Sequence, residues 1–330
     1  SQQEKIYGNT LALDDTAFTT LDKDGDSALP NGEVVTNVTI SSATGVDAST
    51  SSDVTTYTDE INIESPVAGT AGTGDGFLES NYDITYVSGD LKVNPRSITV
   101  TPTQQEKIYG NTLTLDETAF TVTDLDSDAL LPNGESIDTV SVISRGGHDA
   151  STTSSAVTYA DDLEATSVAT SSAGFDLDNY TIDFTNLADF VINRRAVTLT
   201  ALQQEKDYGD VHTLDTATFS VLDLDNDALL PNGETVDTVT LVSASGIDAS
   251  TDADVATYSG NISITPTSTA TPTLAGSNSF DQENYTFSYN TGDLVINQRA
   301  ITLTASQQEK IYGNTLALDD TAFTTLDKDG

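Results

Sequence analysis

The sequence predicts an all-β protein made of tandem β-sandwich modules of roughly 100 residues. Three observations lead to this prediction. The chain repeats itself, apolar residues in the recurring segments alternate with period two, and no stretch keeps an apolar period of 3.6 residues. Thr, Ser, Val and Asp, which are abundant throughout, are poor helix formers.

The repetition has two levels. Gln-Gln-Glu-Lys occurs four times at spacings of about one module, and residues 1–25 are identical to residues 306–330. The first level is therefore a module of roughly 100 residues, and the second is a larger unit of three unlike modules. We expect the 330 residues to be a window on a longer, elongated array.

The recurring strands are recognisable within each module. Segments 93–102, 192–201 and 296–305 alternate apolar residues with Thr, as a half-buried strand does. The run 81–93 predicts a hairpin with Ser-Gly-Asp near its tip, and its aromatic and apolar residues share one face.

Neighbouring modules are joined without a flexible linker. The last strand of one module runs within two residues into the first strand of the next, so we expect short, stiff junctions. This places boundaries near Arg96, Arg195 and Arg299. The predicted modules are 1–95, which lacks its own first strand, then 96–194 and 195–298, with 299–330 supplying the first strands of a fourth.

Composition excludes several functions. With 52 acidic and 12 basic side chains the formal net charge is −40, so the surface would repel nucleic acid. The absence of Cys excludes disulfides and Cys-ligated zinc. No apolar run is long enough to insert into a membrane. The two histidines, His148 and His212, do not recur between modules and have no recurring partner, so we expect no catalytic residues and no enzyme.

The most specific chemical signal is an acidic segment that recurs in each module. Carboxylates stand at positions 1, 3, 5 and 12, the ligand spacing of an EF-hand loop, in which several oxygens converge on one hard cation. The predicted Ca2+ ligands are Asp22, Asp24, Asp26 and Glu33; Asp124, Asp126, Asp128 and Glu135; and Asp223, Asp225, Asp227 and Glu234.

Two departures separate these segments from an EF-hand. Position 6 holds Ser27, Ala129 or Ala228 in place of the Gly that the turn requires, and no helices flank the loop. We therefore expect a calcium loop in a β context. The alternative is an ordinary solvated acidic turn, in which Asp and Asn serve turn geometry.

Two further motifs recur. Gly-x-Asp-Ala-Ser-Thr contains Asp47, Asp149 and Asp248 and is typical of turns. A lysine recurs at Lys5, Lys107, Lys206 and Lys310. It is interpreted as a strand-edge lysine that discourages edge pairing, or as half of an ion pair; a crosslink to Asn or Asp is the sharper alternative.

The short motifs resemble the MBG family of bacterial surface repeats. They are the Tyr-Gly pair after the first strand, the central Leu-Pro-Asn-Gly-Glu, and the closing Asn-Tyr segment followed by Asn-x-Arg. The resemblance implies immunoglobulin-like sandwiches in large exported adhesins and filamentous exoproteins, and it implies no catalytic residues. The dense Asp-x-Asp-x-Asp segment departs from the family's usual pattern.

These observations together predict a structural role. We expect a calcium-rigidified stalk or filament segment of a large bacterial extracellular surface protein that supports adhesion or biofilm. Its partners would be neighbouring modules and, in a fibre, other copies of the chain. The alternative is a multivalent array in which each module weakly binds a polysaccharide or another surface.

Overall fold

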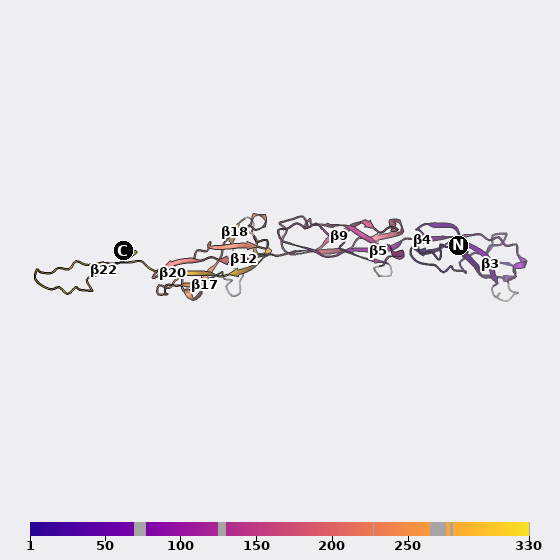
Figure 1. The fold of residues 1–330 in the computed structure, drawn as a ribbon. Helices are drawn as coiled ribbons and strands as arrows, with labels where there is room; N and C mark the ends of the chain where they lie inside the picture. Colours follow the sequence, from indigo (N-terminus) through magenta and orange to yellow (C-terminus); the bar gives the residue numbers. More distant parts are fainter. Residues whose placement is uncertain (69–76, 125–129, 227, 265–274, 278–279, 330) are drawn as a thin grey trace. The chain divides into compact units, whose positions relative to one another are not determined.

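The computed structural model describes residues 1–68, 77–124, 130–226, 228–264, 275–277 and 280–329 (Figure 1). In these ranges the regular elements are β-strands and three-residue 3-10 turns, and no α-helix occurs. The prediction of an all-β protein is confirmed. No helix within the same ranges is long and apolar enough to span a membrane.

The chain divides into two compact units. The first comprises 1–105, 114–149 and 158–190, and the second comprises 106–113, 150–157 and 191–330. These limits do not coincide with the predicted module boundaries, which stay a prediction. We use "first", "second" and "third repeat" for residues 1–95, 96–194 and 195–298.

The first repeat contains one four-stranded sheet. Its strands are β1 (Gln3–Ile6), β2 (Val35–Ser42), β3 (Thr56–Ala68) and β4 (Gly89–Asn94), in the order β1-β4-β3-β2. β1 pairs with β4 in parallel, and the other pairs are antiparallel. In β4, Leu91 and Val93 are almost fully buried while Lys92 and the other residues of the strand are partly exposed, which is the period-two pattern expected of a half-buried strand.

The second repeat begins with β5 (Arg96–Pro102). β5 lies between β10 (Tyr180–Asp183), its parallel neighbour, and β7 (Phe120–Asp124), its antiparallel neighbour. β8 (Ile137–Ser144) and β9 (Thr158–Ser171) form an antiparallel pair. The remaining strands of this repeat are β6 (Gln105–Ile108) and β11 (Leu187–Asn193).

The third repeat has the same kinds of pairing. β12 (Arg195–Ala201) lies between β14 (Phe219–Asp223) and β19 (Tyr285–Asn290). A second sheet has the order β13 (Gln204–Asp207), β20 (Gly292–Asn297), β17 (Thr257–Ile264) and β16 (Leu241–Ser243). β15 (Thr235–Thr238) pairs with β18 (Ala275–Ser277) in this repeat. After the third repeat, β21 (Ile301–Ala305) pairs with β22 (Phe323–Asp327).

The hairpin predicted for 81–93 is wrong, because residues 82–88 form no strand and β4 pairs with β1 and β3. Its counterpart in the third repeat, 284–296, forms no hairpin either. β19 and β20 follow each other in sequence, but β19 pairs with β12, and β20 pairs with β13 and β17. The chain therefore crosses from one sheet to the other at this point. Gly292 begins β20 so close to the Ala201 carbonyl that a Cβ atom would lie 2.5 Å from its oxygen, and this position requires glycine.

Each repeat has 3-10 turns at two equivalent places, and the third repeat has one more, η6. Three of them, η1 (Pro30–Gly32), η3 (Pro132–Gly134) and η5 (Pro231–Gly233), end the acidic loops. Their central asparagines have φ between 59° and 62°, a left-handed conformation that Asn adopts more readily than most residues. The others are η2 (Glu79–Asn81), η4 (Leu177–Asn179), η6 (Ala244–Gly246) and η7 (Gln282–Asn284).

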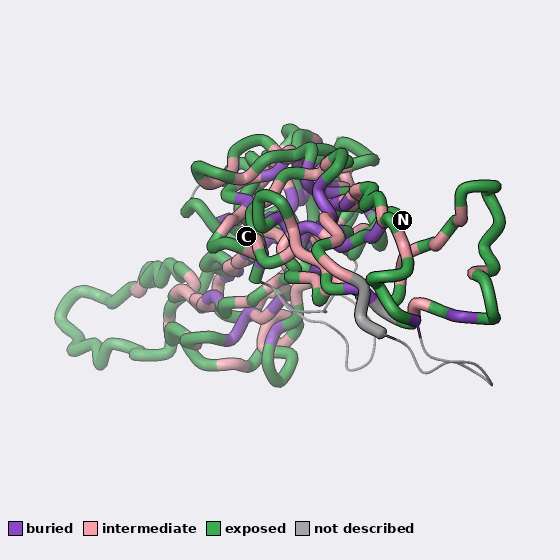
Figure 2. Tube along the Cα trace, turned by 90° about the vertical axis from the view of Figure 1, so that its right-hand side faces the viewer, coloured by how far each residue is buried: buried purple, intermediate pink, exposed green. Residues whose placement is uncertain are grey.

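The core is built from alternate residues of these strands. Figure 2 marks the buried residues along the chain in purple. β5 and β12 have the same burial pattern, in which an arginine at the first position is buried together with every second residue after it. Ile98, Val100, Val197 and Leu199 are at most 2% exposed. The buried arginine was not expected from the apolar alternation, and its partners lie in the candidate metal loops.

Candidate metal loops and repeat junctions

The first acidic loop is held by its own backbone. Oδ1 of Asp22 accepts hydrogen bonds from the amides of Asp24 and Asp26, each at 2.9 Å. Asp24 and Asp26 are exposed, and Asp24 forms a surface ion pair with Lys23 at 3.1 Å. Glu33 is buried and accepts a hydrogen bond from the Tyr82 hydroxyl at 2.7 Å.

In the second and third loops the carboxylate at position 1 is buried against an arginine. Asp124 accepts from Nε and Nη2 of Arg96 at 3.0 and 2.5 Å. Asp223 accepts from the same two atoms of Arg195 at 2.9 and 2.7 Å. Asp225, at position 3, is exposed and pairs with Nη2 of Arg195. Asp126, Asp128 and Asp227 lie outside the described residues.

The other side of each arginine faces the preceding repeat. Nη1 of Arg96 donates to Oδ1 of Asn9 at 3.0 Å, and Nη1 of Arg195 donates to Oδ1 of Asn111 at 3.1 Å. The same nitrogens lie 3.4 and 3.5 Å from the carbonyl oxygens of Tyr7 and Tyr109, respectively. One guanidinium therefore joins the acidic loop of its own repeat to the Tyr-Gly turn of the repeat before it.

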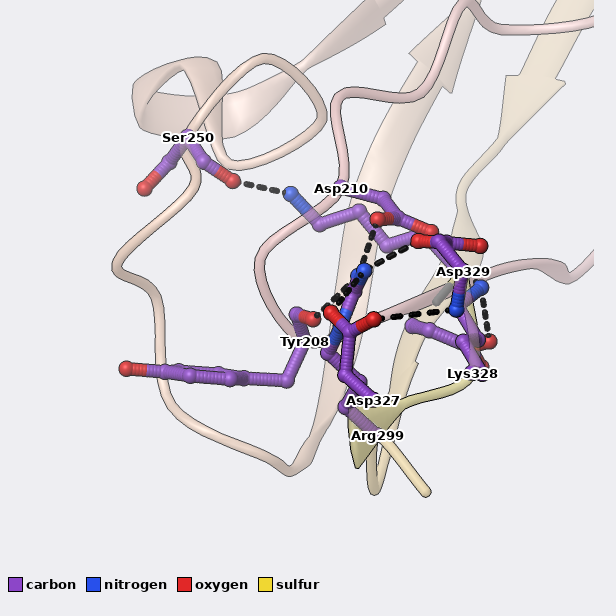
Figure 3. A network of polar contacts seen from close by, with 9 residues as sticks. Tyr208, Asp210, Ser250, Arg299, Asp327, Lys328 and Asp329 are labelled. Carbon is purple, nitrogen blue, oxygen red and sulfur yellow. Dashed lines mark hydrogen bonds and ion pairs between the residues drawn. The ribbon is translucent and has the colours of Figure 1, made fainter. Parts of the chain in front are cut away.

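Figure 3 shows the same arrangement at Arg299. Its Nε donates to Asp327 at 3.0 Å, its Nη2 contacts Asp327 and Asp329, and its Nη1 donates to Asp210 at 2.6 Å. Hydrogen bonds to Asp327 and Asp210 raise the pKa of Arg299, and the bond from Arg299 lowers the pKa of Asp327. At Arg195, burial opposes the charge, but the bonds to Asp223 and Asp225 outweigh it and raise the pKa.

The glutamate at position 12 also bridges two repeats. Glu135 accepts from the hydroxyls of Tyr7, in the first repeat, and Tyr180, in its own. Glu234 likewise accepts from Tyr109, in the second repeat, and from Tyr285 at 2.8 Å.

The paired tyrosine rings meet edge to face, with ring centroids 5.5 Å apart at both junctions. We call each set of two tyrosines and one glutamate a Tyr–Glu–Tyr cluster. Burial and the bond to glutamate raise the pKa of Tyr7 and of Tyr109 to about 12, and raise that of Tyr180 and Tyr285 further.

The Tyr-Gly turn is also in van der Waals contact with the next repeat. A Cβ atom on Gly8 would lie 2.6 Å from Cβ of Pro132, and one on Gly110 would overlap Pro231. Asparagines add polar contacts: Oδ1 of Asn179 accepts from the Val54 amide at 2.8 Å. The equivalent bond in the third repeat joins Asn284 to the Ala156 amide at 2.8 Å.

Three of the predicted calcium ligands of the third loop already have other partners. In the third loop an arginine occupies the position that a cation would take between Asp223 and Asp225. Both oxygens of Glu234 already accept hydroxyl hydrogens. Within the described ranges, no group of three or more His, Cys, Asp or Glu side chains is arranged to hold a metal. Calcium binding therefore stays a prediction.

The recurring lysine and the Gly-x-Asp-Ala-Ser-Thr turn are partners. Lys206 is buried, and its Nζ donates to the carbonyls of Ile247, Asp248 and Ser250. Lys5 donates to the carbonyls of Val46 and Ser49 in the same way, and burial lowers its pKa. The lysine therefore satisfies backbone oxygens of the turn, a role that neither the edge-lysine nor the crosslink interpretation had anticipated.

Comparison of the chain with protein-family models, with curated proteins and with solved structures finds no match. The resemblance to MBG repeats therefore stays a prediction.

Proposed function

We propose that the chain is a structural segment of a large bacterial extracellular surface protein, a stalk or filament made of tandem immunoglobulin-like sandwich modules. The modules would be those bounded near Arg96, Arg195 and Arg299. In this role a repeat needs defined contacts with its neighbours, so that length and direction are maintained along the array.

The observation that carries the proposal is the recurrence of one set of contacts at successive junctions. Glu135 and Glu234 each accept from a tyrosine of the preceding repeat. Arg96 and Arg195 each donate to an asparagine of the preceding repeat. Each contact satisfies a buried polar group, and an unsatisfied buried group costs about 1–3 kcal/mol. Loosening a junction would therefore be costly.

Small-angle X-ray scattering of the full chain tests the proposal. A single compact globule of 330 residues would have a radius of gyration of about 20 Å. We expect a clearly larger value and a long tail in the pair-distance distribution. A radius near that of a globule would contradict the stalk. Binding of the chain to polysaccharide or mineral surfaces would favour the multivalent array instead.

The predicted calcium dependence needs a separate test, because the proposed function attributes the stiffness of the junctions to side-chain contacts between repeats and not to bound calcium. The sequence-based expectation is a gain of about 2.7 kcal/mol per site at a hundredfold excess over the dissociation constant. Melting of the full chain in calcium and in chelator measures this gain, and replacement of Asp22, Asp24 and Asp26 by Asn assigns it to the first loop. Equal melting under both conditions would remove calcium from the function.

A further inference from the structure

The arginine that begins a repeat lies where the sequence had predicted a calcium ion. Around the guanidinium of Arg195 converge oxygens of Asp223 and Asp225 from one side, and of Asn111 and Tyr109 from the other. Two carboxylates, one amide oxygen and one backbone carbonyl are the ligand types that calcium uses in proteins. Here the same oxygens surround a side chain.

We propose that Arg195, and equally Arg96 and Arg299, is the built-in cation of the acidic loop, and that it couples adjacent repeats without metal. The guanidinium suits this task because its five donors are fixed in a plane. Nε and Nη2 bind the repeat's own loop, while Nη1 binds the preceding repeat. A calcium ion has no such fixed directions, because its coordination geometry is flexible.

The charges at the junction after the third repeat support this assignment. Asp210 stands there in place of Asn9 and Asn111 and adds one negative charge. Lys328 stands where the other two complete junctions have Leu125 and Leu224.

Nζ of Lys328 lies 3.0 Å from Asp210 and 2.6 Å from Asp207. Figure 3 labels Lys328 and Asp210 beside Arg299. Asp207 is a second extra acid, because the other two repeats have Ile6 and Ile108 at this position. One extra base beside the arginine therefore offsets one of the two extra negative charges at this junction.

The proposal makes the loop's response to calcium depend on the arginine. While the guanidinium is present, calcium cannot approach the shared oxygens without displacing a fixed positive charge. When the guanidinium is removed, Asp223 and Asp225 are left facing each other and two further oxygens, a cage that calcium could fill. The proposal does not rest on the stalk function, because it concerns contacts and not location.

The test uses the full chain with Asp22, Asp24 and Asp26 replaced by Asn, so that the first acidic loop cannot contribute to a calcium response. In this background Arg195→Ala is compared with Arg194→Ala. Arg194 is the adjacent residue, half exposed, and pairs with Glu283 at 2.7 Å on the surface. Calorimetric melting in chelator and in calcium, with calcium titration at constant ionic strength, gives the readout.

We expect the background chain and Arg194→Ala to have the same melting temperature, and we expect calcium to leave it unchanged in both. The melting temperature of Arg195→Ala should be lower by roughly 10 °C or more in chelator, because the variant removes the arginine partner of a buried carboxylate. Calcium should then raise the melting temperature of Arg195→Ala by about 5 °C or more, and the titration should show one calcium site more than in the background chain. Arg195→Lys keeps the positive charge but loses the planar arrangement of the guanidinium donors. Its melting temperature should lie between those of the background chain and Arg195→Ala, and it should gain no calcium site.

Two results would overturn the proposal. One is a calcium response of the background chain that Asp225→Asn abolishes while Arg195 is intact. The other is an Arg195→Ala variant that melts like Arg194→Ala. If Arg195→Ala does not fold in either condition, Arg299→Ala repeats the test at a cluster whose arginine is partly exposed and whose strands β21 and β22 are exposed throughout. Failure of Arg299→Ala to gain a calcium site would then refute the proposal.

Discussion

The Tyr109 hydroxyl donates a hydrogen bond to Oε1 of Glu234, which lies 125 positions later and in the next repeat. Tyr109 is 3% exposed, whereas Tyr208, at the same place in the third repeat, is 41% exposed. Because the acceptor is a buried carboxylate, we expect Tyr109→Phe to lower the free energy of unfolding by about 1.5–3 kcal/mol. Tyr208→Phe should change it by less than about 0.5 kcal/mol. Guanidinium unfolding of the full chain measures both, and equal losses would contradict the bridging role.

Glycine substitutions isolate the contact between the Tyr-Gly turn and the next repeat. Gly110 and Gly209 have φ of 87° and 88°, so alanine strains the backbone equally at the two positions. Only at Gly110 would the new methyl group meet a proline, Pro231. We expect Gly110→Ala to lose about 1–3 kcal/mol more than Gly209→Ala, the usual effect of overpacking. Thermal melting of the two variants gives the difference, and the absence of one would place Pro231 away from the turn.

The buried lysines are expected to stabilise the fold through backbone oxygens. Lys206→Met keeps the length of the side chain but removes the ammonium group that donates to the turn carbonyls of Ile247 and Ser250. We expect a loss of about 1–3 kcal/mol in the stability of the third repeat. Lys310→Met is the matched control, since Lys310 belongs to the same motif and is exposed. Urea unfolding of both variants is the measurement, and a large effect at Lys310 would contradict the explanation.

Alkaline pH should open the junctions. The pKa of Tyr7 and of Tyr109 is raised from 10.0 to about 12, chiefly by burial and then by the bonds to Glu135 and Glu234. A raised tyrosine pKa contributes stability that is complete below the ordinary value, near 10, and is lost as pH rises through the folded value.

We therefore expect unfolding free energy to fall between about pH 10 and pH 12. Circular dichroism melting across this range, with phenolate absorbance recorded in parallel, measures the loss. The Tyr109→Phe variant should fall less steeply than the unmodified chain. A stability that does not change over this range would show that the hydroxyls are not held by the glutamates.

The strands were predictable because their signal is local. The alternation of Ile98, Val100 and Thr in β5 recurs in β12, and it gives the observed burial directly. The hairpin prediction failed because β19 and β20 have equally apolar alternation. The sequence of the two strands therefore gives no indication that β19 and β20 belong to different sheets.

Only part of the candidate site could be predicted from the sequence. The acidic loop was predicted, but the EF-hand motif is defined by the spacing of carboxylates within one loop. It contains no information on an arginine that lies outside the loop in sequence. A second signal was present: Arg96, Arg195 and Arg299 each precede the first aspartate of a loop by 28 residues. In a chain with only 12 basic residues that constant spacing indicates a pair. The tyrosine partners of Glu135 and Glu234 gave no comparable signal, because one of each pair belongs to another repeat.

The parallel pairing of β13 with β20 has a mechanical consequence. β13 closely follows the strand by which the chain enters the third repeat, and β20 is the strand by which it leaves. Tension along the chain would pull these two neighbours in opposite directions along their common axis. The load would therefore fall on all of their ladder bonds together, in shear, and not on one bond after another. β1 and β4 are paired in the same way, so each of these repeats should yield to force abruptly and at high load.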